Sequence, residues 1–115
     1  MLADDPEIEI VGEAEDGAQA VRLVETLTPD VAILDVAMPR MTGIEATERL
    51  CSLGSATRVI GLSMHTDPHY VRSMMEAGAR GYVPKDYAAE ELAAAVHAVC
   101  DGALYLSPEL TDPGR

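Results

Sequence analysis

The sequence contains no phenylalanine and no tryptophan, and its only aromatic side chains are four tyrosines. A hydrophobic core must therefore be built mainly from aliphatic residues and methionine. Apolar residues still make up 48% of the 115 residues, which is enough for one core. The length fits a single domain.

Positive charge is also scarce. Eight Lys and Arg residues stand against 20 Asp and Glu residues, and the net charge is −12. Because the basic residues are scattered and a nucleic-acid backbone must be neutralised by Lys and Arg, we expect no nucleic-acid binding by this chain. The acidity fits protein partners or a cation site, and it equally fits the simpler need to keep the domain soluble.

Several kinds of motif are missing. Cys51 and Cys100 show neither metal-ligand spacing nor a disulfide framework, which predicts free thiols in a reducing, cytoplasmic setting. We find no signal-peptide pattern, no apolar run of membrane length, and no Gly-rich phosphate loop or dinucleotide fingerprint. We therefore expect a cytoplasmic domain that neither crosses a membrane nor cradles a nucleotide.

Short apolar runs alternate with amphipathic stretches along the chain. The runs predict strands at 7–12, 31–34, 58–63 and 81–84. Helices are predicted after an N-cap at Asp16, after a cap at Thr42, from 66–68 to 77–78, and over 88–99. Strict alternation of strands and helices predicts an α/β fold with a parallel sheet.

Polar residues follow three consecutive predicted strands. Asp35 ends one strand, Ser63 ends the next, and Lys85 follows the last. Ligands of open parallel sheets bind at the carboxyl ends of the strands, so we expect the three side chains to converge. A carboxylate can form an acyl phosphate, a hydroxyl can bond a phosphoryl oxygen, and a lysine can neutralise the new anion. Alone, an aspartate after a strand is more often a turn or cap residue.

Longer motifs carry a family resemblance. Asp35 is followed by Met-Pro three and four places on and by Gly eight places on, which resembles the phosphorylation motif of response-regulator receiver domains. The segments 59–63 and 79–85 are similar to the receiver strands that end in Ser or Thr and in Lys, and 6–14, 89–92 and 106–108 resemble the NarL/FixJ type. The resemblance covers essentially the whole chain. It implies a flavodoxin-like (CheY-like) doubly wound sheet, with a receiver over 1–106 and a linker-like tail over 107–115.

The resemblance also implies roles for individual residues. Asp35 would accept a phosphoryl group from a phosphohistidine of a sensor kinase, and Ser63 and Lys85 would bind it. Tyr82 would swing inward behind Ser63 as a switch, although it could also be a plain, half-buried strand aromatic. The backbone carbonyl of Ala37, with Asp35, would be a ligand of Mg²⁺.

Two histidines are weaker candidates. His65, two residues past Ser63, could contact the water that attacks the acyl phosphate, but an exposed loop histidine is the simpler interpretation. His97 is expected to be a surface or interface residue.

The start of the sequence departs from the family pattern. A receiver begins with a buried strand whose terminal acids hold Mg²⁺. Asp4 and Asp5 could be that acidic pair, or they could end a first helix that runs into the strand at 7–12. We prefer the second register, because a parallel crossover needs about a dozen residues. We thus expect about four strands and four helices, and a Mg²⁺ site without its acidic pair.

Without that strand, sheet edges would be exposed, and exposed edges invite pairing with another chain. Three explanations of the missing strand stay open. The chain is a shortened product or has a mis-assigned start, it forms a homodimer or strand-swapped dimer, or its remaining strands pair with one another in a degenerate receiver. Our leading function is a two-component receiver that regulates an output, commonly transcription through a DNA-binding domain beyond this chain. The second hypothesis is a phosphorylation-independent interaction module. An enzyme is not expected, since Asp35 has no partnered base.

Overall fold

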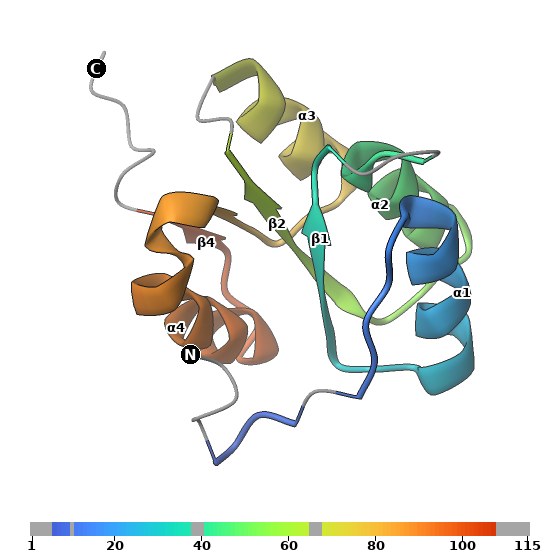
Figure 1. Ribbon diagram of the computed structural model, residues 1–115, viewed down its shortest axis with the longest axis horizontal. Helices are drawn as coiled ribbons and strands as arrows, with labels where there is room; N and C mark the ends of the chain where they lie inside the picture. Colours follow the sequence, from blue (N-terminus) through green and yellow to red (C-terminus); the bar gives the residue numbers. More distant parts are fainter. Residues whose placement is uncertain (1–5, 10, 38–40, 65–67, 108–115) are drawn as a thin grey trace.

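A computed structural model describes residues 6–9, 11–37, 41–64 and 68–107. In these ranges the strands form one parallel sheet in the order β1-β2-β3-β4 (Figure 1). Their bounds are β1 Val31–Asp35, β2 Arg58–Ser63, β3 Gly81–Pro84 and β4 Tyr105–Leu106. The sheet is therefore the α/β, parallel arrangement that the alternating sequence predicts.

Helices cover both faces of this sheet (Figure 1). They are α1 Gly17–Leu27, α2 Gly43–Ser52, α3 Pro68–Ala77 and α4 Ala88–Cys100, and a 3-10 turn at Lys85–Tyr87 precedes α4. One buried cluster joins α1, α2 and α3 to the sheet, and a second joins α4 to the opposite face. No helix in the described ranges is long and apolar enough to cross a membrane.

Local signals fix the ends of the first two helices. The Asp16 carboxylate accepts a hydrogen bond from the Gln19 N–H at 2.8 Å and caps α1. Thr42 and Glu45 form a reciprocal capping box at the start of α2. Both N-caps are confirmed, as are the strands predicted at 31–34, 58–63 and 81–84.

The strand predicted at 7–12 is wrong for the described residues of that range. Residues 7–9 and 11–14 run across the molecule from α4 to α1 without strand structure (Figure 1). Ile8 packs with the α4 cluster, and Ala14 packs with the α1 cluster. An alternating sequence becomes a strand only where a neighbour supplies hydrogen bonds. None of the described residues in 6–14 forms a backbone hydrogen bond with β1.

The fourth strand of the sheet is instead β4, which the sequence did not predict. It pairs with β3, and hydrogen bonds flank it: the Tyr105 N–H donates to the Arg80 carbonyl at 2.9 Å, and the Ser107 N–H donates to the Tyr82 carbonyl at 3.1 Å. Two residues are too few to show a periodicity. The predicted number of strands is met, but with a different set of strands.

A carboxylate on α4 holds β4 in place. Glu91 accepts hydrogen bonds from the Tyr105 hydroxyl and from the Ser107 hydroxyl, both at 2.8 Å. Ser107 is fully buried. Burial, followed by the hydrogen bond and negative charge of Glu91, raises the pKa of Tyr105 to about 12.

We predict that Glu91→Gln lowers the pKa of Tyr105, because the negative charge disappears while burial remains. The raised pKa favours the folded state below the ordinary tyrosine pKa of about 10, and this contribution is lost as the pH rises through about 12. Tyrosinate absorbance, measured with and without Tyr105→Phe, isolates this group. Glu90→Gln removes a charge from the same helix turn and is the matched control. An unchanged Tyr105 titration in Glu91→Gln would contradict the contact of Glu91 with the Tyr105 hydroxyl.

Candidate functional site

Three strand ends meet at one edge of the sheet. The parallel register sets Asp35 opposite Leu62 and Ser63 opposite Pro84, so Lys85 lies just past the end of β3. The Lys85 ammonium forms an ion pair with Oδ2 of Asp35. The side chains of Lys85 and Asp35 are 38% and 31% exposed, so a reactant from solvent can reach both.

The second carboxylate oxygen of Asp35 is also held. The Ala37 N–H donates a hydrogen bond to Oδ1 at 2.9 Å. An amide on one oxygen and an ammonium on the other fix the plane of the carboxylate. Such charge-assisted contacts are short and directional, so they keep the carboxylate aimed at the edge of the sheet.

Gly43 lets α2 begin directly behind the carboxylate. The Gly43 N–H donates to the Val36 carbonyl at 2.9 Å. A Cβ at this position would lie 2.9 Å from the carbonyl carbon of Asp35 and would overlap its oxygen. The glycine eight places after Asp35 therefore has a packing reason, since only a residue without a side chain fits there.

Ser63 and Tyr82 lie behind the exposed pair. Ser63 is 1% exposed and Tyr82 is fully buried, so Tyr82 is not the half-buried aromatic of the simpler interpretation. Burial raises the pKa of Tyr82, a hydrogen bond with Ser63 opposes this shift, and the charge of Asp35 adds to it. Tyr82 is thus linked electrostatically to Asp35 and by a hydrogen bond to Ser63.

The sequence reasoning missed Gly61, which makes room for Tyr82. These residues are paired across β2 and β3. A Cβ at Gly61 would lie 2.8 Å from Cε of Met74 and 3.1 Å from Cδ2 of Tyr82. A glycine inside an otherwise aliphatic strand marks a site of close approach, and that signal was available in the sequence.

The described residues do not by themselves fit a Mg²⁺ ion. Mg²⁺ takes oxygen ligands, usually including one or two carboxylates. Here Asp35 and the carbonyl of Ala37 are the candidate ligands, and both oxygens of Asp35 are already engaged. No group of three or more His, Cys, Asp or Glu residues that could hold a metal occurs within the described ranges. Asp4, Asp5 and His65 lie outside the described residues, and His97 on α4 faces Glu7, with 3.7 Å between Nε2 and Oε1.

Sequence comparisons identify relatives of the whole chain. The family model of the response regulator receiver domain matches residues 1–97. The chain is 41% identical to the transcriptional regulatory protein DegU of Brevibacillus brevis over 111 residues, which are 96% of this chain and 47% of that protein. It is 37% identical to the nitrate/nitrite response regulator protein NarL of Escherichia coli K12, over 96% of this chain and 51% of that protein. The chain spans about half the length of these curated relatives.

Solved structures give the same result. The signal receiver domain of the putative response regulator NarL from Mycobacterium tuberculosis matches with a TM-score of 0.84 and 37% identity, covering 88% of this chain and 82% of that one. A LuxR-family two-component response regulator from Aurantimonas sp. SI85-9A1 matches with a TM-score of 0.87 and 35% identity, covering 91% and 75%. The fold is therefore shared with these response-regulator structures over most of the chain.

We predict that Gly61→Ala destabilises the domain, because the added methyl group would lie 2.8 Å from the Met74 methyl group and 3.1 Å from the Tyr82 ring, and both side chains are fully buried. Overpacking a buried site costs about 1–3 kcal/mol. Denaturant unfolding measures the loss, and near-ultraviolet circular dichroism reports the displaced tyrosine. In a Tyr82→Leu background the cost should shrink, since the rigid ring edge is gone. Equal costs in both backgrounds would show that Tyr82 is not the obstacle.

Proposed function

The chain belongs to the response regulator receiver domain family, and on that basis we propose that Asp35 accepts a phosphoryl group from a sensor histidine kinase. The observation that carries this proposal is the ion pair between Asp35 and Lys85 at the strand ends, with Ser63 ending the strand between them. Because the curated relatives include transcriptional regulators, the output we propose is control of transcription.

The transfer itself needs few groups. A carboxylate oxygen of Asp35 attacks the phosphorus atom of a phosphohistidine, and the bond from phosphorus to the imidazole nitrogen breaks with its electron pair going to that nitrogen. The product is an acyl phosphate. Lys85 neutralises part of the charge that it brings, and the Ala37 N–H keeps the carboxylate oriented.

The signal then passes through Ser63 and Tyr82. We propose that the Ser63 hydroxyl turns to the phosphoryl group, which brings a stronger acceptor than the Tyr82 hydroxyl. In that step Ser63 would exchange its hydrogen bond with Tyr82 for one with the phosphoryl group. Because Tyr82 is already fully buried, the change to be detected is in its hydrogen bond and in the packing around it, rather than in its burial.

Receiver domains generally bind Mg²⁺, whereas the described residues of this chain do not complete such a site. That disagreement supports a second candidate function. A module that keeps the receiver fold and binds its partner without phosphorylation would hold Asp35 permanently paired with Lys85. The two functions differ in whether Asp35 can be modified.

We predict that acetyl phosphate with Mg²⁺ adds the mass of one phosphoryl group to the chain, because Asp35 is partly exposed and its carboxylate is positioned for attack. Intact mass spectrometry measures the adduct. Asp35→Asn should abolish it, and Asp86→Asn, which removes an exposed carboxylate next to Lys85, should keep it. If no adduct forms at saturating Mg²⁺, the phosphoacceptor role fails for this chain and the interaction module takes its place.

We further predict that Lys85→Ala slows formation of the adduct at least tenfold, because the developing charge loses its cation. Removing one such electrostatic contact typically costs about 100- to 1000-fold in rate. Lys85→Arg keeps the charge with a different geometry, so its rate of adduct formation should fall between those of the wild type and Lys85→Ala. Arg80→Ala removes a cation from the opposite end of β3 and should leave the rate unchanged. An unaltered rate in Lys85→Ala would show that Lys85 does not assist the transfer, and it would leave the proposed role of Asp35 intact.

A further inference from the structure

The acceptor loop, residues 36–37 and 41–42 of the described chain, lies between β1 and α2 and directly follows Asp35. Its first part holds the carboxylate, because the Ala37 N–H donates to Oδ1 of Asp35 at 2.9 Å. Its two ends are tied together, since the Gly43 N–H donates to the Val36 carbonyl at 2.9 Å. The position of the acceptor loop therefore sets the orientation of the Asp35 carboxylate.

Another main-chain bond ties the acceptor loop to α1. The Gly17 N–H donates a hydrogen bond to the Met41 carbonyl at 3.1 Å. Gly17 is the first residue of α1, after the Asp16 N-cap, so its N–H is one of the donors that a helix leaves without an internal partner. Met41 directly precedes Thr42, the N-cap of α2. The starts of α1 and α2 are thus joined across the loop, at the end of the sheet where β1 ends (Figure 1).

This close approach requires a glycine at position 17. An added Cβ would overlap the Met41 carbonyl oxygen and would lie 2.7 Å from its carbonyl carbon. These are main-chain atoms, which cannot turn away as the end of a flexible side chain can, so α1 or the acceptor loop would have to move. Gly17 is buried and is not among the glycines with a positive φ. Because helix propensity alone favours alanine there, the approach of Met41 is the physical reason for the glycine.

A displacement of Met41 would reach Asp35 through the main chain. Met41 lies two residues before Gly43, which packs directly behind Asp35: a Cβ on Gly43 would lie 2.9 Å from the Asp35 carbonyl carbon. Gly43 in turn bonds Val36, and Val36 adjoins Ala37. Because this path consists of main-chain atoms and hydrogen bonds, side-chain rotation cannot absorb a shift before it reaches the Ala37 N–H.

We propose that Gly17 is a positioning residue for phosphoryl transfer to Asp35, an inference that rests on the proposed function. Its N–H and its missing side chain hold Met41 in place, Met41 holds the acceptor loop, and the acceptor loop keeps the Asp35 carboxylate aimed for attack. Gly17 acts only through the loop, so the groups that meet the phosphoryl group, Lys85 and Ser63, are unchanged when Gly17 is replaced.

The test compares the wild type with Gly17→Ala in the rate at which acetyl phosphate with Mg²⁺ forms the phosphoryl adduct, over a series of acetyl phosphate concentrations. We expect the maximal rate to fall about tenfold or more, because a misplacement of about 1 Å at a reacting group can cost about 100-fold. The half-saturating concentration should stay the same, since the groups that meet the reactant are kept. Equal maximal rates in the two proteins would overturn the proposal.

Amide NMR spectra test the coupling without any phosphoryl donor. In Gly17→Ala the Ala37 N–H resonance should shift from its wild-type position, whereas that of Gly102, in the turn after α4, should not. An unmoved Ala37 resonance would overturn the coupling of Gly17 to the loop. Absence of the adduct from the wild type would overturn the proposed function instead, so the two failures are distinct.

A measurement on the wild type covers the case in which Gly17→Ala folds poorly. Formation of the adduct on Asp35 should shift the Gly17 amide resonance, because the acceptor loop that carries its hydrogen-bond partner responds to the new group. A Gly17 resonance that stays in place while that of Ala37 moves would overturn the proposal.

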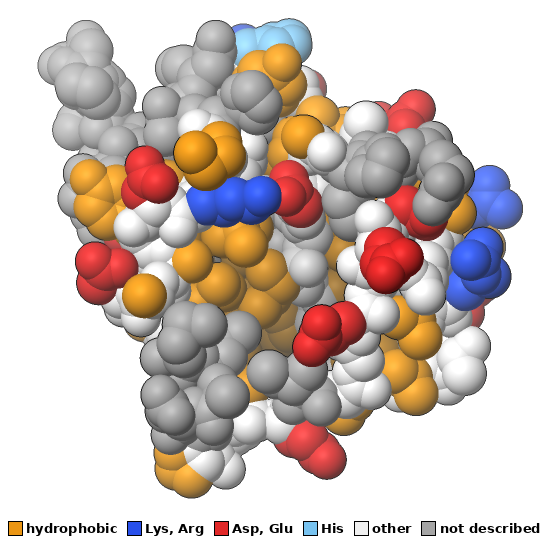
Figure 2. Space-filling model, in the orientation of Figure 1, with side chains coloured by type: hydrophobic (Ala, Val, Ile, Leu, Met, Phe, Trp, Pro, Cys, Tyr) orange, Lys and Arg blue, Asp and Glu red, His pale blue; other side chains and the backbone are white. Residues whose placement is uncertain are grey.

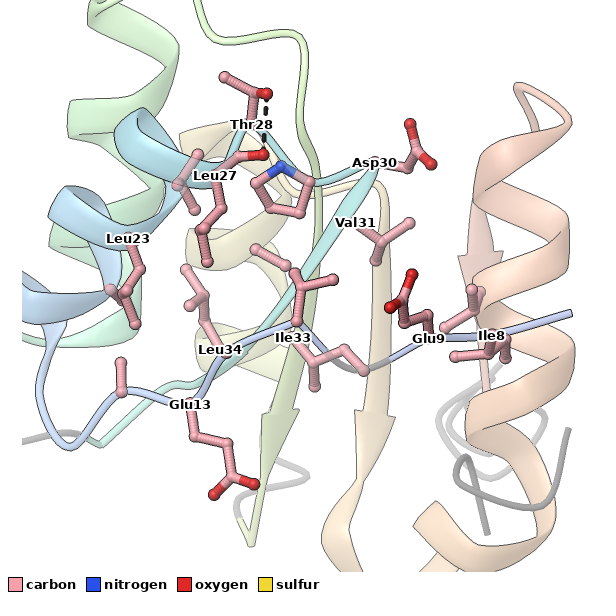
Figure 3. A pocket seen from close by; sticks show the side chains of 18 of the residues that line it. Ile8, Glu9, Glu13, Leu23, Leu27, Thr28, Asp30, Val31, Ile33 and Leu34 are labelled. Atoms are coloured by element: carbon pink, nitrogen blue, oxygen red, sulfur yellow. Dashed lines mark hydrogen bonds between the residues drawn. The ribbon is translucent and has the colours of Figure 1, made fainter. Parts of the chain in front are cut away.

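Gly12→Ala is the matched control, since it also adds one methyl group and changes no charge. Charge matters because acidic side chains are spread over the face of the molecule in Figure 2, and a change in them would alter the attraction of the acetyl phosphate anion. The added methyl group would lie 3.1 Å from Cδ1 of Leu27 and 3.8 Å from Cδ1 of Leu23, which are the ends of flexible side chains on α1 (Figure 3). Gly12→Ala should therefore keep the wild-type rate. A loss of rate as large as that in Gly17→Ala would overturn the assignment to the contact with Met41.

Discussion

The parallel register of β1, β2 and β3 is the constraint on which the candidate site depends. It sets Asp35 beside Leu62 and Ser63 beside Pro84, and so delivers a carboxylate, a hydroxyl and an ammonium to one edge of the sheet. A slip of one residue would turn every side chain of a strand to the opposite face. In this register Lys85 lies just past the end of β3 and its ammonium forms an ion pair with Asp35.

The aliphatic core and the polar site meet at Tyr82, which is the largest of the fully buried side chains in the described structure. A buried phenol needs a hydrogen-bond partner, and Ser63 at the end of β2 provides one. Gly61 and Met74 leave just enough space for the ring. The chemistry at Asp35 and the packing between the sheet and α3 are therefore coupled through one residue.

The two outer strands of the sheet, β4 and β1, have different surroundings. At the β4 edge, Glu91 bonds two hydroxyls and ties the strand to α4. At the β1 edge, a cavity with aliphatic walls and an acidic rim lies beside backbone groups that have no strand partner among the described residues.

The sequence by itself determined the α/β class, three of the four strands, the N-caps at Asp16 and Thr42, and the three residues that meet at the strand ends. These follow from local periodicity, from capping and from the rule that parallel strands end together. Only the tertiary structure decided that residues 7–9 and 11–12 are not a strand and that Tyr105–Leu106 is one, because strand structure depends on a neighbour distant in sequence. It also decided that Tyr82 is fully buried, since that burial depends on the space left by Gly61 and Met74 on other elements.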